Sequence, residues 1–204
     1  MSEPVEIADR LEPVVEGVWY WGVENRAIGG AISSSHAIET GAGAILIDPV
    51  RLVDSELSKL APVAAIVLTA RCHQRSCWRY RAQLGVPVWA PLDATGEDEQ
   101  PDRRYAEREL IGDALLPVRT PGPEHAHYAV LAPSRRTLFC PDLLSHSPEF
   151  GLAFVPAEYH EQPAETRRST AALLDLEFDA LCFDHGPPLT GDPRTAIEQL
   201  LRRT

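Results

Sequence analysis

The chain has 204 residues, of which 44% are hydrophobic and 24% are charged, and its formal net charge is -11 at pH 7. This length and composition indicate one domain with a substantial core. The acidic excess disfavours binding to nucleic-acid phosphates, and no apolar run is long enough to span a bilayer, so we expect neither nucleic acid nor membrane as a partner. The acidic N-terminus lacks the apolar stretch of a signal peptide, which predicts a cytoplasmic protein.

The cysteines do not suggest a structural metal site. Cys72, Cys77, Cys140 and Cys182 are scattered through apolar or strand-like segments and show no paired-ligand spacing. This usage is typical of a protein in a reducing, cytoplasmic environment.

The first half of the chain is predicted to contain mostly strands. The chain is predicted to form a single domain that spans residues 1–204. Residues 1–13 are polar and interrupted by proline, which predicts that they form a loose N-terminal arm of this domain. Apolar runs rich in β-branched and aromatic residues predict strands over 17–23, 31–39, 44–49, 66–69 and 86–91. The glycines of residues 40–43 predict a hairpin turn. Helices are expected over 56–60, with Asp54 as N-cap, and over 76–85.

The second half repeats the pattern. Strands are predicted over 115–119, 127–131, 136–140 and 180–183, and the third of these forms a hairpin with the second. Helices are predicted over 164–176 and after Asp192, which has the features of an N-cap followed by proline. Residues 95–108 are dense in charge and are predicted as an exposed loop or a short helix. Residues 145–163 lack a period and are predicted as a long loop over the site. Hairpins followed by strand–helix units favour two sheets packed face to face, with helices outside.

Five segments in chain order resemble motifs of the metallo-β-lactamase-fold superfamily. The segments are AILIDP at 44–49 (LIDxG), IVLT at 66–69 (the strand before HxHxDH), TPG at 120–122 (TPGH), LFCPD at 138–142 (LFTGD) and DHGPP at 184–188 (PGHGP). The chain is therefore similar to this superfamily over nearly its whole length. The resemblance implies a four-layer αβ/βα sandwich, with two packed mixed sheets, outer helices and a dinuclear metal site at one sheet edge.

Most of the metal ligands that the resemblance implies are replaced. Their positions in HxHxDH and TPGH are taken by Ala70, Cys72, Gln74, Arg75 and Pro123. Only Asp142, at the metal-bridging aspartate, and His185, at the last histidine, match the family pattern. A zinc site in a protein needs three or four ligands. The resemblance thus predicts an eroded site that holds no metal, or one zinc, iron or manganese ion bound by Asp142, His185 and Cys72.

The replacements suggest their own chemistry. Arg75 puts a permanent cation where a metal ligand would lie, so we expect its guanidinium to pair with Asp142. Cys72 and His73 are further candidates for catalysis, the thiol because neighbouring arginines can lower its pKa. Adjacent residues of an extended chain face opposite ways, so His73 is expected to point away from Cys72. Asp142 and His185 can equally well bond their own loops.

Two classes of function stay open at this point. Because the residues that carry the chemistry are largely absent, we favour a non-catalytic binding or scaffold protein, with a homodimer as one form. The alternative is a divergent metal-dependent hydrolase of esters, thioesters or phosphodiesters with a rebuilt, mononuclear site. Metal-free chemistry by Cys72, Arg71 and His73 is a third hypothesis. Since a fold does not determine a function, the candidate site must decide between them.

Overall fold

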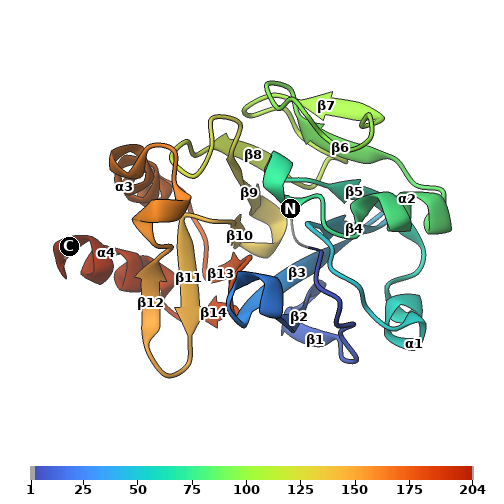
Figure 1. Cartoon of the computed structure of the whole chain (residues 1–204), viewed down its shortest axis with the longest axis horizontal. Helices are drawn as coiled ribbons and strands as arrows, with labels where there is room; N and C mark the ends of the chain where they lie inside the picture. Colours follow the sequence, from blue (N-terminus) through green and yellow to red (C-terminus); the bar gives the residue numbers. More distant parts are fainter. Residues whose placement is uncertain (1–2, 204) are drawn as a thin grey trace.

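The computed structural model describes residues 3–203, and two β-sheets form its centre (Figure 1). The first sheet has seven strands in chain order: β1 (Glu12–Val15), β2 (Val18–Asn25), β3 (Ala31–Thr40), β4 (Gly43–Ile47), β5 (Val63–Val67), β6 (Val88–Pro91) and β7 (Arg103–Tyr105). Neighbours from β1 to β4 are antiparallel, and neighbours from β4 to β7 are parallel.

The second sheet has five strands in the order β14-β13-β10-β9-β8. Their bounds are β8 (Leu116–Arg119), β9 (Tyr128–Ala132), β10 (Thr137–Cys140), β13 (Ala180–Phe183) and β14 (Leu189–Thr190). Only β10 and β13 are parallel. Strands β11 (Leu144–Ser147) and β12 (Gly151–Phe154) pair as a separate antiparallel hairpin.

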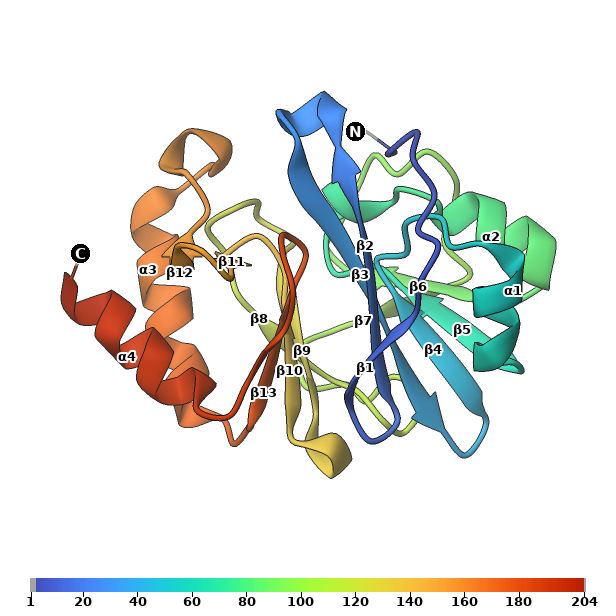
Figure 2. The ribbon, with the colours of Figure 1, turned by 90° about the horizontal axis from the view of Figure 1, so that it is seen from below.

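Helices cover the outer face of each sheet, as Figure 2 shows. Helices α1 (Asp54–Leu57) and α2 (Cys77–Leu84) pack on the first sheet, and α3 (Pro163–Ala172) and α4 (Pro193–Arg203) pack on the second. This is the four-layer αβ/βα sandwich predicted above. No helix among the described residues is long and apolar enough to cross a membrane.

The layers explain the near-continuous apolar runs in the sequence. In β4, Ile45 and Ile47 pack between the two sheets, whereas Leu46 packs under the outer helices. Alternate side chains of a strand point to opposite faces, and here both faces are covered, so every position is apolar. A third cluster of buried residues joins the second sheet to α3 and α4, with Leu138 and Ile197 among its members.

Local predictions met mixed outcomes. The hairpins β3–β4 and β9–β10 are confirmed, and so is the Asp192 cap, whose Oδ1 accepts from Thr195 N at 3.1 Å. Asp54 is the first residue of α1 rather than its cap, which is Val53. The exposed segment 95–108 contributes β7, and the predicted loop 145–163 contains the β11–β12 hairpin, because edge pairing supplies order that a sequence period does not reveal.

The N-terminal arm is not loose over its described part, residues 3–13. Ala8 exchanges backbone hydrogen bonds with the segment 51–53, both at 2.9 Å, and Leu11 N donates to Glu56 Oε2 at 3.1 Å. Both side chains are buried in the core under the outer helices. Two apolar anchors therefore hold this polar segment against the domain. Residues 1 and 2 of the predicted arm lie outside the described residues.

Candidate functional site

Three buried or half-buried carboxylates meet where strands of both sheets end. Asp48 follows β4, Asp142 follows β10 and Asp184 follows β13. Strands β4 and β5 are parallel, as are β10 and β13, so their carboxyl ends lie at one edge of each sheet. Ser34 of β3 bridges the sheets, since its backbone N donates to the Asp184 carbonyl at 2.8 Å. Function gathers at such strand ends because loops there can converge.

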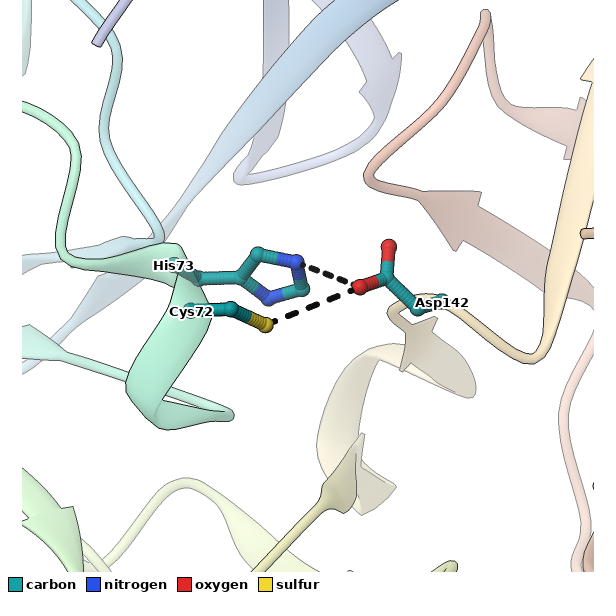
Figure 3. Close-up of side chains that lie close together, drawn as sticks. All are labelled: Cys72, His73 and Asp142. Atoms are coloured by element: carbon teal, nitrogen blue, oxygen red, sulfur yellow. Dashed lines mark hydrogen bonds and ion pairs between the residues drawn. The ribbon is translucent and has the colours of Figure 1, made fainter. Parts of the chain in front are cut away.

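Cys72 and His73 both reach Asp142 from the loop after β5 (Figure 3). His73 Nε2 lies 3.0 Å from Asp142 Oδ2, and the Cys72 thiol lies 3.7 Å from the same oxygen. The expectation that these neighbours face opposite ways is wrong because residues Arg71–His73 form a 3-10 helix rather than an extended segment. His73 does not stand at a ligand position of the family motif, yet it is buried and lies at the centre of the site.

Both ring nitrogens of His73 face acceptors. On the Nδ1 side, Asp184 Oδ2 lies at 3.0 Å, Thr69 Oγ1 at 3.1 Å and Asp48 Oδ2 at 3.4 Å. The Thr69 hydroxyl donates its own hydrogen to Asp48, so it can only accept from His73. With Nε2 against Asp142, both nitrogens act as donors, which defines a buried imidazolium.

Arg75 supplies the second buried cation. Its Nη2 lies 3.1 Å from Asp184 Oδ2, and its Nη1 donates to the carbonyl oxygens of Ser34 at 2.6 Å and Asp48 at 3.2 Å. The predicted ion pair of Arg75 with Asp142 is therefore wrong, since the guanidinium pairs with Asp184 instead. The carbonyls of Ser34 in β3 and of Asp48 just after β4 fix it there, and its side chain is only 5% exposed.

The pKa directions follow from this arrangement. Burial by itself would lower the pKa of His73, but Asp142 and Asp184 overcome it and raise that pKa well above its usual value. Burial would raise the pKa of Asp142, yet His73 and His185 hold it well below the usual range. His73 and Arg75 likewise lower the pKa of Asp184 to about 2 against the effect of burial. Asp48 is the exception, because burial and the neighbouring Asp184 raise its pKa.

His185 closes the site on the side of the second sheet. Its Nδ1 donates to the Ile32 carbonyl at 2.9 Å, and its Nε2 lies 3.1 Å from Asp142 Oδ1. The loop after it approaches the β11 backbone closely at Gly186, where φ is +103° and an added Cβ would lie 1.8 Å from the His146 carbonyl oxygen. Only glycine fits there.

We expect Gly186→Ala to lower the free energy of unfolding by at least about 1 kcal/mol, because the loop must move and the residue is in a left-handed region. Chemical denaturation measures the loss. Gly41→Ala is the control, since a Cβ at that turn meets nothing within 4 Å and its φ is not positive. Equal stability of the two variants would contradict the expected clash.

Backbone strain marks two of these positions. Asp48 has φ 45° and Arg75 has φ 36°, and residues other than glycine rarely adopt such positive backbone angles. Each such residue costs on the order of 1–3 kcal/mol and persists only when its surroundings hold it. The ion pairs of the site provide that restraint at both positions.

Five of the residues singled out from the sequence line one cavity. Cys72, His73, Arg75, Asp142 and His185 surround a volume of about 220 Å³, together with Asn25, Ile28 and Ser33. A larger cavity of about 490 Å³ shares three of these lining residues and opens toward the loop after β12. The site is thus a two-part cleft with a charged floor.

Sequence reasoning missed Asp184 and the role of His73. Asp184 directly precedes the matched His185, and its carboxylate pairs with both buried cations. The signal was an acid at a strand end beside a motif residue, as at Asp142. Asp48 holds the loop after β5 by accepting from Thr69 N at 2.9 Å.

The residues present do not fit a dinuclear metal centre. Ala70 and Pro123 offer no donor, and Arg75 offers a cation. The Gln74 amide is turned to other partners, since its oxygen accepts from Trp78 Nε1 at 2.8 Å and Asp98 N at 2.7 Å. Two groups of possible donor atoms remain, one from Cys72, His73 and Asp142 and one from Asp48, His73 and Asp184, and within each group the atoms lie within 4.8 Å of one another.

The chain has the metallo-β-lactamase fold, as comparison with solved structures shows. It is similar to the DIM-1 metallo-β-lactamase exposed to ceftazidime at 15% identity and a TM-score of 0.78, over 98% of each chain. It is also similar to the FIM-1 enzyme from Pseudomonas aeruginosa in its mono-zinc form, at 16% identity and a TM-score of 0.74 over 99% of this chain and 98% of that one. A further similar structure is a metallo-β-lactamase from Pontibacter korlensis, at 18% identity and a TM-score of 0.73 over 96% of this chain and 99% of that one. No family model and no curated protein matches the sequence.

Proposed function

We propose that this protein is a non-hydrolytic binding protein of the metallo-β-lactamase fold whose site works without a metal. One observation carries the proposal: the cations of His73 and Arg75 lie among the carboxylates of Asp48, Asp142 and Asp184, at 3.0–3.4 Å. Buried acids need partners, and here side chains provide them.

The balance of charge supports the same function. Asp142 and Asp184 have lowered pKa values and are ionised, whereas Asp48 has a raised one. Each of these two ionised acids lies beside a buried cation, and a divalent ion would have to displace the His73 proton before Nε2 could bind it. Nucleophilic catalysis by Cys72 is also disfavoured, because burial raises the pKa of its thiol and His73 already holds protons on both nitrogens.

We expect the protein, purified without chelator, to contain well below one equivalent of zinc, iron or manganese per chain, also after incubation with excess zinc. Elemental analysis measures this, with Asp142→Ala and His185→Ala as variants. Near-stoichiometric metal that both variants lose would contradict the proposal. Metal that both variants keep would be bound elsewhere and would leave the proposal standing.

A mononuclear metal-dependent hydrolase is the second candidate. The observation in its favour is the convergence of Cys72, His73 and Asp142, with His185 Nε2 beside Asp142. A thiolate, two imidazoles and a carboxylate are a donor set that zinc accepts. When bound there, a metal would supply an activated water for hydrolysis. Zinc-dependent cleavage of p-nitrophenyl acetate or bis(p-nitrophenyl) phosphate, lost in Cys72→Ser, would favour this candidate over the first.

A further inference from the structure

The two cavities of the cleft have different chemistry. The larger one is lined mainly by apolar side chains, among them Ile28, Val155 and Tyr159, and its polar groups include Asp142 and His185. The smaller one continues from those two residues into the charged floor. We propose that the ligand of this cleft is an organic ammonium compound, with its cationic head at Asp142 and an apolar body along Ile28, Val155 and Tyr159. This inference rests on the proposed function, in which no metal occupies the floor.

The choice of a cation follows from which charges face the cleft. The side chains of His73 and Arg75 are only 4% and 5% exposed, and their donors point to carboxylates and backbone carbonyls. Asp142 is 18% exposed and lines both cavities, although its Oδ1 is itself buried and lies 3.1 Å from His185 Nε2. Asp48 and Asp184 are almost fully buried, so Asp142 is the carboxylate of the floor that a ligand can approach through a charge-assisted hydrogen bond.

The surroundings of the cleft also favour a positively charged ligand. Among the described residues, no lysine or arginine lines the larger cavity, and its basic side chain is His185, which lies against Asp142. The chain carries a net charge of -11, which draws cations toward the molecule and repels anions. Tyr159 is 72% exposed at the rim, where its ring can cover an apolar body or lie against a cation. A volume of about 490 Å³ suits a small organic molecule rather than a peptide segment.

A series of matched probes tests the proposal by calorimetry at pH 7: octylammonium, octanol and octanoate. They share one apolar chain and differ in the charge of the head. We expect octylammonium to bind at least about tenfold more tightly than either other probe, the effect of one charge-assisted hydrogen bond. Asp142→Asn should abolish this preference.

A second pair of variants keeps the test independent of the buried network. Ile28 is 38% exposed at the mouth, so substitution there does not disturb the core. Ile28→Lys should weaken octylammonium binding and strengthen octanoate binding, while Ile28→Gln, the neutral control, should change both in the same direction.

Octanoate or octanol binding as tightly as octylammonium would overturn the inference, and so would the absence of binding by all three probes. An Asp142→Asn variant that folds and keeps the preference would overturn it as well. None of these outcomes bears on metal content, so the proposed function can stand when the ammonium inference fails. Stoichiometric metal would instead remove the proposed function itself.

Discussion

Replacing Arg75 by methionine is expected to lower the free energy of unfolding by about 3–5 kcal/mol. Methionine keeps much of the apolar length of the side chain but removes the charge. Asp184 then stays buried beside His73 without its guanidinium, and the carbonyls of Ser34 and Asp48 lose their donors. Breaking a buried pair costs far more than the pair contributes, because one charge is left uncompensated. Denaturant unfolding followed by tryptophan fluorescence measures the change.

The control is an arginine–aspartate pair of similar geometry on the surface. Arg136 contacts Asp179 through Nε and Nη2, at 2.5 and 2.9 Å, but the two side chains are 49% and 62% exposed. Arg136→Met should lower the free energy of unfolding far less than Arg75→Met does, because water screens an exposed ion pair. Adding Asp184→Asn to Arg75→Met should recover part of the loss. Equal effects of the two arginine substitutions would show that Arg75 does not compensate a buried charge.

Acid is expected to destabilise the protein between pH 6.5 and pH 4 through two buried neutral histidines. His36 lies between the rings of Tyr20 and Phe139, at centroid distances of 5.7 and 5.5 Å, and burial lowers its pKa to about 4. His127 bonds Thr120 through Nδ1 and leaves Nε2 without a partner, and burial lowers its pKa to about 4 as well.

The direction of this pH effect follows from the number of protons that the folded and unfolded states bind. The unfolded chain takes up a proton on each histidine near pH 6.5, whereas the folded chain does so only near pH 4. Between these values the unfolded state binds more protons, so the free energy of unfolding falls as the pH falls. Each histidine contributes up to about 3 kcal/mol of this loss.

The measurement is the pH dependence of the free energy of unfolding for wild type and for His36→Leu. The variant should lose part of the slope between pH 6.5 and pH 4, by up to about 3 kcal/mol in total. The carboxylates titrate alike in both proteins, so their effect cancels in the comparison. His125→Gln is the control and should leave the slope unchanged, since this side chain is 69% exposed. Parallel curves for wild type and His36→Leu would contradict the assignment.

The fold followed from short-range patterns. The run Ile45 to Ile47 predicted a strand, which the structure covers on both faces, and the glycines of 40–43 predicted the hairpin that joins β3 to β4. Five motifs in chain order then indicated the layered sandwich. The patterns failed where order depends on a distant partner. Strand β7 exists because β6 pairs with it, and the β11–β12 hairpin packs near β13.

The residues singled out from the sequence lie close together, but their pairing was not predicted. Cys72, His73, Arg75, Asp142 and His185 were all singled out, and they line one cavity. Their partners were predicted wrongly in two cases, because the direction of a side chain depends on the backbone of its loop. A 3-10 helix at Arg71–His73 turns His73 inward, and a left-handed residue at position 75 aims the guanidinium at Asp184.

The sequence by itself determined the layered fold, which residues stand at the motif positions and the presence of acids at strand ends, since residue type and periodicity are properties of neighbouring residues. Only the tertiary structure decided which charges meet. Asp48, Asp142 and Asp184 lie in three segments separated by 94 and 42 residues (142 - 48 and 184 - 142), and parallel pairing within two sheets brings them around one imidazole. Electrostatic energy depends on distance in space and on burial, and neither can be obtained from the order of residues along the chain.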